Sequence, residues 1–317
     1  MKGMIRKLVG ALLIVTAGVV ALTRQDDRPV ETLVARWAPP PSEFVEVRGQ
    51  VVHLRDEGPR GDPLPIVLIH GTGASLHTWE GWVAQLKTQR RVVTFDLPGF
   101  GLTGPFAGQY PSGDYRGDSY ARFVVDLLDR LQVQRVVIGG NSLGGEVAWR
   151  TAVLAPQRVE RLVLVDASGP RFTPQVIPPG FAIARVPVLN RVAEHLLPRS
   201  MVRATLHSVY GDPARVAEPV VDRYFDITLR EGNRRALNQR LALLESDLRP
   251  ELIGKVSQPT LILWGERDRL IPPQTAQLFA ASIAGSQVVV LPGLGHVPQE
   301  EDPQASLAAA KAFLGVD

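Results

Sequence analysis

The chain has 317 residues, of which 45% are hydrophobic and 21% are charged, and its formal net charge is +3. This balance is typical of a globular protein, and the length suits one large α/β domain with an insertion. No basic run is interleaved with aromatic residues, so nucleic-acid binding is not expected. Cysteine is absent, which excludes disulfides, thiolate metal sites and a cysteine nucleophile. No His/Asp/Glu cluster has metal-ligand spacing, and we expect neither a metal nor another cofactor.

The first 23 residues (1–23) form a segment of their own, followed by a predicted exposed linker over residues 24–43. A basic start precedes an uncharged apolar stretch over residues 8–22, which has two interpretations. One is a signal peptide that is cleaved near residues 19–21. The other is a retained membrane anchor, although fifteen residues at ~1.5 Å rise fall short of the ~30 Å hydrocarbon core. Both predict a membrane-anchored or exported protein with its main domain on the non-cytoplasmic side.

Residues 44–170 are predicted to form the first part of an α/β core. Apolar runs that predict strands alternate with stretches of helical periodicity, in the order strand 44–47, strand 51–55, strand 65–69, helix 75–87, strand 91–95, helix 119–131 and strand 135–139. This alternation predicts a mostly parallel sheet with helices on both faces.

A tight turn at residues 140–144 has a G-x-S-x-G pattern centred on Ser142, between a predicted strand and a predicted helix. Such a turn forces the serine into a strained backbone conformation. Its flanking residues must be glycine, because a Cβ there would collide with the neighbouring strand or helix. The turn also presents the serine hydroxyl at a helix N-terminus, where developing negative charge is stabilised. Ser142 is therefore the predicted nucleophile.

The alternation stops over residues 171–246, where proline-rich turns and helical stretches predict a helical insertion. The core resumes over residues 247–317 with predicted strands at 259–265 and 287–291. Asp268 and His296 follow these two strands, and ligands bind at the carboxyl ends of parallel strands.

A serine nucleophile needs a base, and the base needs an orienting carboxylate. His296 is the predicted base and Asp268 the predicted acid, because in this arrangement the chain order is serine, acid, histidine. Two rival carboxylates stay open. Glu266 lies two residues before Asp268, and Asp166 ends the strand that follows the nucleophile helix.

Backbone amides are predicted to stabilise the oxyanion of an acyl-transfer reaction. One is the N–H of Leu143, the residue after the nucleophile. The other comes from the glycine-rich loop that opens with His70, where Thr72 is the expected donor and Gly73 its rival. His70 is expected to hold the shape of this loop. His53 is interpreted as a solvated strand residue.

Further motifs carry a family resemblance. Residues 96–101 read D-x-P-G-x-G after a strand, residues 70–73 read H-G-x-G, and residues 295–303 read G-H-x-P-x-x-E-x-P. With the serine turn and the order of elements, these motifs resemble the α/β-hydrolase superfamily over residues 44–315. The resemblance implies the α/β-hydrolase fold, with the insertion at 171–246 as a helical cap that covers the active site.

The superfamily includes esterases, lipases and meta-cleavage C–C bond hydrolases. We predict a serine hydrolase of the carboxylesterase or lipase type, acting on a small-molecule ester with a short-chain or lipid-like acyl group. The alternative is a meta-cleavage C–C bond hydrolase, which needs cations for the substrate carboxylate; the candidates are Arg185, Arg191, Arg199 and Arg203. A third reading is a non-catalytic binding protein of the same fold. Such proteins usually lose a triad residue, whereas this chain keeps all three.

Overall fold

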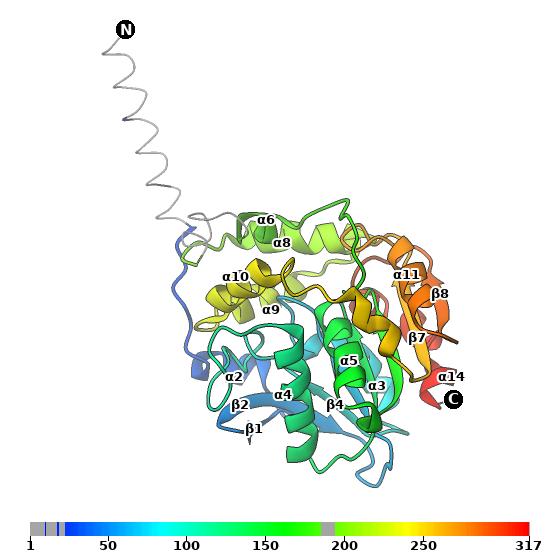
Figure 1. Cartoon of the computed structure of the whole chain (residues 1–317). Helices are drawn as coiled ribbons and strands as arrows, with labels where there is room; N and C mark the ends of the chain where they lie inside the picture. Colours follow the sequence, from blue (N-terminus) through cyan, green and yellow to red (C-terminus); the bar gives the residue numbers. More distant parts are fainter. Residues whose placement is uncertain (1–9, 11–17, 19–22, 185–193, 317) are drawn as a thin grey trace.

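The computed structural model describes residues 10, 18, 23–184 and 194–316. Its centre is an eight-stranded sheet with the strand order β1-β2-β4-β3-β5-β6-β7-β8 (Figure 1). The strands are β1 (Glu43–Val47), β2 (Gln50–Glu57), β3 (Ile66–Ile69), β4 (Val92–Phe95), β5 (Val136–Asn141), β6 (Val159–Val165), β7 (Thr260–Gly265) and β8 (Gln287–Leu291). Strands β3 to β8 are parallel, and β2 is antiparallel to both of its neighbours. The predicted mostly parallel α/β sheet is confirmed.

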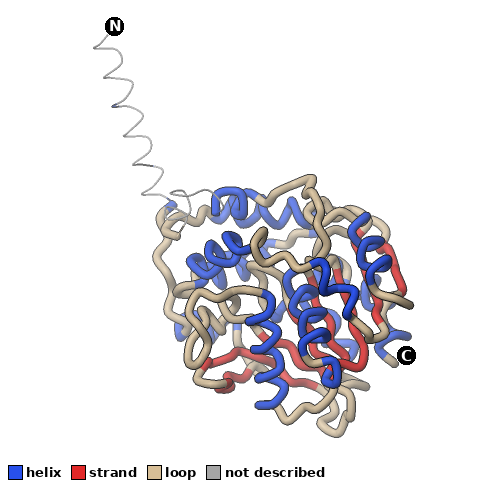
Figure 2. Tube along the Cα trace, in the orientation of Figure 1, coloured by secondary structure: helices blue, strands red, loops and turns tan. Residues whose placement is uncertain are grey.

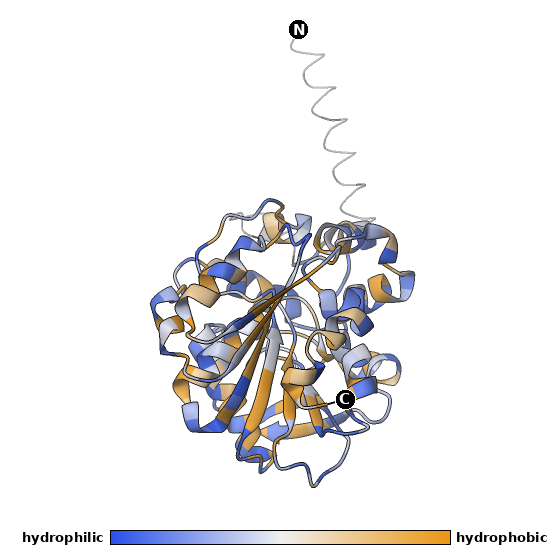
Figure 3. Cartoon of the chain, turned by 90° about the vertical axis from the view of Figure 1, so that its right-hand side faces the viewer, coloured by the Kyte–Doolittle hydropathy of each residue, from blue (hydrophilic) through white to orange (hydrophobic). Residues whose placement is uncertain are grey.

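Helices cover both faces of the sheet (Figure 2). One layer consists of α4 (Gly117–Arg130), α5 (Leu143–Leu154) and α11 (Gln274–Ser282); the other consists of α3 (Glu80–Leu86), α13 (Pro303–Ala308) and α14 (Lys311–Leu314). Because side chains alternate along a strand, Val67 and Ile69 of β3 face the first layer and Ile66 and Leu68 face the second. Burial on both faces explains why a central strand such as β3 is continuously apolar, and apolar colouring predominates along the strands in the middle of Figure 3.

Helices replace strands between β6 and β7, as the sequence predicts. This region contains α6 (Pro179–Ala184), α8 (Arg199–Val209), α9 (Glu218–Thr228) and α10 (Asn233–Leu243), with the short turns η3 (Pro213–Arg215) and η4 (Pro250–Lys255). The four α-helices lie together in the upper part of Figure 1. We call residues 171–246 the cap.

The prediction of an exposed linker over residues 24–43 is wrong. Residues 31–37 form the helix α2 (Glu31–Trp37), and Leu33 is buried. Asp226 of α9 accepts hydrogen bonds from three side chains of this segment, Arg28 at 2.7 Å, Arg36 at 2.9 Å and Trp37 at 3.0 Å. We call residues 24–37 the strap. A local pattern could not reveal it, because its partners lie almost two hundred positions later in the chain.

The interpretation of residues 1–23 as a signal peptide or an anchor falls mostly on residues that the structure does not describe. Among the described residues, no helix has the length and apolar character needed to span a membrane.

A local difference from the prediction concerns the helix expected over residues 75–87. It is divided into the 3-10 turn η1 (Leu76–Trp79) and α3.

Candidate active site

The turn between β5 and α5 holds Ser142 in a strained conformation. Its backbone angles are φ 55° and ψ −117°, a region that side chains rarely adopt. A Cβ on Gly144 would lie 2.1 Å from the carbonyl oxygen of Ile69, and a Cβ on Gly140 would lie 2.1 Å from that of Gly144. The glycines therefore allow the close packing that keeps the turn tight. The strand, turn and helix predicted around Ser142 are all present.

His296 and Asp268 lie on the loops that follow β8 and β7. His296 Nδ1 is 2.7 Å from Asp268 Oδ2. The other Asp268 oxygen accepts hydrogen bonds from the backbone N–H groups of Leu270 and Ile271, at 2.8 and 2.9 Å. Three donors thus hold the Asp268 carboxylate in place. Because Nδ1 of His296 is engaged, its Nε2 is the ring nitrogen left to act in the cavity that it shares with Ser142.

The two rival carboxylates lie elsewhere. Glu266 is exposed and accepts a hydrogen bond from a backbone N–H of the loop after β8. Asp166 is fully buried, has a positive φ of 45°, and accepts a hydrogen bond from the N–H of Gly265 at 2.9 Å. Burial, and then the charge of Asp268, raises the pKa of Asp166 well above its usual range. The carboxylate hydrogen-bonded to His296 is that of Asp268.

The loop after β3 brings Thr72 and Gly73 to the cavity that contains Ser142. This close approach depends on Gly71, because a Cβ there would lie 3.1 Å from the Ser142 Cβ. Leu143 is the first residue of α5, so its N–H belongs to the helix N-terminus and carries its partial positive charge. The three predicted oxyanion residues therefore all lie around the serine.

Asp96, at the end of β4, supports the loop that carries Thr72. Its Oδ1 accepts a hydrogen bond from the N–H of Leu76 at 2.7 Å. Burial would raise the pKa of Asp96, but three neighbouring histidines, His53 foremost, hold that pKa well below its usual range. His70 Nε2 accepts a hydrogen bond from the N–H of Leu97 at 2.9 Å, so His70 connects the same loop to the next strand end, as expected.

The prediction that His53 is solvated is wrong. It lies on β2, between β1 and β4, and is fully buried. Its Nδ1 is 2.7 Å from Asp96 Oδ2, and its Nε2 is 3.0 Å from Ser42 Oγ. His77 is also buried, which lowers its pKa to about 4, and its Nε2 lies 2.7 Å from the carbonyl oxygen of Trp37. Both rings are structural, and neither lines the cavity at Ser142.

Two largely apolar lobes of a cavity meet at Ser142. They share four residues, Thr72, Ser142, Phe181 and Leu270. The first, the α8 lobe, is lined in addition by Gly73, Asn141, Pro178, Leu197, Met201, Val202, Thr205, Leu206, Val209, Tyr224, Leu237, His296 and Val297, among others. The second, the α10 lobe, is lined in addition by Glu146, Ser168, Arg171, Phe172, Ile177, Arg240, Leu241, Leu244, Glu245, Leu248 and Ile271, among others. His296 belongs to the α8 lobe.

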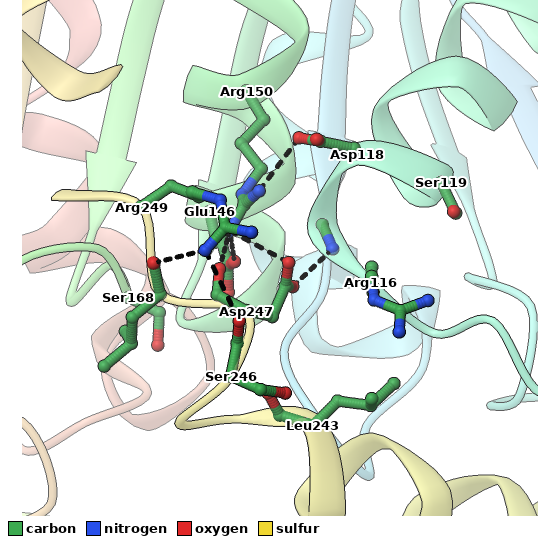
Figure 4. A network of polar contacts seen from close by, with 12 residues as sticks. Arg116, Asp118, Ser119, Glu146, Arg150, Ser168, Leu243, Ser246, Asp247 and Arg249 are labelled. Carbon is green, nitrogen blue, oxygen red and sulfur yellow. Dashed lines mark hydrogen bonds and ion pairs between the residues drawn. The ribbon is translucent and has the colours of Figure 1, made fainter. Parts of the chain in front are cut away.

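A largely buried cluster of charges surrounds Arg150 (Figure 4), and two of its members, Glu146 and Arg240, line the α10 lobe. Arg150 of α5 pairs with Glu146, one turn earlier, at 2.8 Å and with Asp118 of α4 at 2.8 Å. Arg240 of α10 pairs with the same Glu146 at 2.6 Å and with Asp247 at 3.1 Å. Buried charges are tolerated when they are paired in this way. The cluster joins the end of the cap to α5.

Glu301, in α12 (Pro298–Glu301), joins the loop of His296 to the cap. Its carboxylate accepts hydrogen bonds from the N–H of the residue before His296 and from the N–H groups of Gly211 and Asp212 in the cap. The N–H of His296 itself donates to the carbonyl oxygen of Val209 at 2.7 Å. In the sequence Glu301 is only the glutamate of a family motif. Its role depends on backbone groups from a distant segment, which no sequence pattern marks.

Known proteins resemble this chain in sequence and fold. The family model described as alpha/beta hydrolase fold matches residues 65–303. The 2-hydroxy-6-oxo-2,4-heptadienoate hydrolase of Pseudomonas putida is 31% identical, over 80% of this chain and 90% of its own. The pimeloyl-[acyl-carrier protein] methyl ester esterase of Edwardsiella ictaluri is 33% identical, over 78% of this chain and 92% of its own.

Solved structures agree with the family model. The crystal structure described as a membrane phospholipase A is 25% identical to this chain with a TM-score of 0.70, and the match covers 99% of this chain and 98% of that one. A hydrolase from Pseudomonas aeruginosa is 29% identical with a TM-score of 0.70, over 87% of this chain and 99% of its own. Sequence, strand order and serine turn lead to one conclusion, that the protein belongs to the α/β-hydrolase family.

Proposed function

We propose that the protein is a serine hydrolase that cleaves carboxylic esters through an acyl-enzyme on Ser142. The hydrogen bond between His296 Nδ1 and Asp268 carries the proposal, because it leaves Nε2 free to act on a serine in the same cavity. Family membership supports hydrolase chemistry in general. The strained turn at the N-terminus of α5 supports the role of the serine.

In the proposed reaction, Ser142 Oγ attacks the carbonyl carbon while His296 Nε2 takes the hydroxyl proton. The oxyanion accepts hydrogen bonds from the N–H of Leu143 and from that of Thr72 or Gly73. The C–O bond to the alcohol then breaks, and His296 gives the proton to the departing alcohol oxygen. Water attacks the acyl-enzyme by the same proton path, which releases the acid and restores the serine.

The position of His296 gives each lobe a role in this scheme. The base must protonate the departing oxygen, so the alcohol lies on the side of His296, in the α8 lobe. The acyl chain then occupies the α10 lobe, whose lining residues include Leu241, Leu244 and Leu248. The apolar lining of the α8 lobe favours a hydrophobic alcohol part, and the leucines of the α10 lobe, which lie beside the charged Arg171 and Glu245, favour a hydrophobic acyl chain.

Charge in the cavity favours ester cleavage over C–C bond cleavage. In meta-cleavage chemistry the departing fragment carries a carboxylate, so a cation should lie in the α8 lobe. No described residue lining that lobe is an arginine or a lysine. Of the predicted candidates, Arg199 pairs with Glu218 and Asp222 on the cap, and Arg203 pairs with the same Glu218. Residues 185 and 191 lie outside the described part of the chain.

We also propose that residues 1–23 place the protein at or beyond a membrane. The basic and then apolar sequence supports this, as does the likeness to a membrane phospholipase A over 99% of the chain. After cell fractionation, an anchored protein would stay with membranes through an alkaline carbonate wash, whereas a cleaved signal would give a shortened protein by mass. Recovery of the full-length chain in the cytosol would contradict both forms of the proposal.

The first test of function is turnover of p-nitrophenyl esters from acetate to palmitate by the full chain. Ser142→Ala is the blank, because it removes the nucleophile and should leave the fold intact. We expect hydrolysis by the wild type and a loss of at least ~10³-fold in kcat in the variant. A wild type that is no faster than Ser142→Ala on every ester would overturn the proposed function. A 2-hydroxy-6-oxo-dienoate substrate then tests the C–C alternative.

A further inference from the structure

Asp166 and Asp268 are two buried carboxyl groups that adjoin each other behind His296. Asp166 is fully buried and Asp268 is 2% exposed. A carboxylate oxygen of Asp166, a carboxylate oxygen of Asp268 and a ring nitrogen of His296 all lie within 4.8 Å of one another. Two ionised carboxylates so close and so deeply buried would strongly disfavour each other. The proposed reaction uses Asp268 alone, so the second carboxyl has no assigned role.

The hydrogen bonds at the two groups differ. Both oxygens of Asp268 accept hydrogen bonds, one from two backbone N–H groups and the other from His296. Asp166 Oδ1 accepts one, from Gly265, while Asp166 Oδ2 is buried and receives no donor. A buried carboxylate oxygen without a donor is costly, but a protonated oxygen next to an anion is itself a donor. The pattern fits an anion at Asp268 and an uncharged acid at Asp166.

The surrounding charges act in the same direction. Burial raises the pKa of Asp166, and the negative charges of Asp268 and then Glu301 raise it further. The N–H of Gly265 acts in the opposite sense and is outweighed. The charged groups that face Asp166 come from the loop after β7, the loop after β8 and α12, namely Asp268, His296 when it is protonated, and Glu301.

We propose that Asp166 is a positioning residue whose uncharged carboxyl group donates its O–H to the Asp268 carboxylate. The donated hydrogen bond holds Asp268 in line with His296 Nδ1 and stabilises its charge while the ring carries the proton from Ser142. This inference rests on the ester hydrolysis proposed above. Two of the three candidate acids of the sequence then have a role, Asp268 as the anion and Asp166 as its neutral hydrogen-bond donor.

The test compares Asp166→Asn with Asp166→Ala in the full chain. Asparagine tolerates the positive φ of this position and reproduces the neutral acid, because its amide oxygen can accept from Gly265 and its NH₂ group can donate to Asp268. Alanine removes both hydrogen bonds. The measurements are kcat, KM and the pH midpoint of the acidic limb of kcat/KM, corrected for folded protein by active-site titration.

We expect Asp166→Asn to keep kcat within ~3-fold and the midpoint within ~0.3 pH unit, because no charge is removed. Asp166→Ala should lower kcat by ~10-fold or more at similar KM, since the support of Asp268 is lost. If Asp166 were ionised, Asp166→Asn would remove a charge near His296 and lower the midpoint by about one pH unit. That shift, an unchanged kcat in Asp166→Ala, or failure of Asp166→Asn to fold would each overturn the proposal.

An infrared difference spectrum, wild type minus Asp166→Asn at neutral pH, gives a result that does not depend on turnover. We expect the carbonyl stretch of a protonated, buried carboxylic acid in the wild type and its loss in the variant. Its absence from the wild type contradicts the inference even in an active ester hydrolase. Its presence in a protein that hydrolyses no ester would leave the uncharged Asp166 standing and overturn the proposed function, together with the positioning role that depends on it.

Discussion

In the proposed reaction, the hydrogen bond from His296 Nδ1 to Asp268 Oδ2 decides which ring nitrogen acts in the cavity. In Asp268→Asn an amide replaces the carboxylate, and its NH₂ group would donate to Nδ1 and favour the wrong tautomer. We expect kcat to fall by about 10⁴-fold. The accompanying loss of transition-state stabilisation should be far larger than the change in the free energy of unfolding. Glu266→Gln is the matched control and should keep kcat within ~2-fold. The reverse result, with Glu266→Gln inactive, would assign the acid to Glu266.

The raised pKa of Asp166 also predicts how stability depends on pH. A folded-state pKa above the unfolded value of about 3.9 means that unfolding releases a proton between those two values. The wild type should therefore lose stability relative to Asp166→Asn by ~1.4 kcal/mol per pH unit from about pH 4 until the folded pKa is passed. Urea unfolding of both proteins across this range measures the difference. A difference that is constant with pH would contradict the raised pKa.

Strand ends made the catalytic candidates predictable from sequence. Asp268 and His296 each follow a short apolar strand, and parallel strands bring their carboxyl ends to one edge of the sheet. That Asp166 lies next to Asp268 was less predictable from the sequence. It depends on the pairing of β6 with β7, which sets Val165 beside Leu263, and local periodicity does not define that register.

At the scale of elements, the cluster around Arg150 holds α5, α4 and the end of the cap together. Arg150 has a side chain only 2% exposed and pairs with carboxylates of Glu146, Asp118 and Asp247. Arg150→Met would keep the packing of the long side chain but leave the buried Glu146 and Asp247 paired with Arg240 alone among the arginines of this cluster. We expect the free energy of unfolding to fall by ~3–5 kcal/mol in denaturant titration. The control Arg203→Met removes an exposed pair and should show no measurable change.

The two elements that the sequence analysis did not predict, α2 and η1, are both determined by contacts with distant residues. Buried strands such as β5 and β7 are visible because continuous apolar sequence is sufficient to identify them. The helix α2 has seven residues and one buried side chain, Leu33, so its stability comes from the ion pairs of Arg36 with the cap rather than from its own pattern. Likewise, η1 interrupts the predicted helix over residues 75–87 where Asp96 accepts the N–H of Leu76.

At the scale of the whole molecule, the strap joins the N-terminal segment to the cap and the core. Its side chains reach Asp226 of α9, while Asp27 pairs with Arg234 of α10. At its other end, the carbonyl oxygen of Trp37 contacts His77 of the core. The strap therefore spans the two parts of the protein that enclose the cavity. A chain that begins near Val30, in the middle of the strap, would lose two of these five contacts, those of Asp27 and Arg28.

Two truncations test this role. A chain that begins at Thr23 keeps the strap, so its melting temperature and kcat should match those of the full chain. A chain that begins at Pro39 leaves the buried Asp226 carboxylate without its three donors, which should lower the melting temperature by about 5–10 °C. It should also expose the cap to faster proteolysis. Asp226→Asn in the full chain weakens the same contacts, so it should also lower the melting temperature, by a smaller amount. Equal melting temperatures for the two truncations would show that the strap does not stabilise the cap.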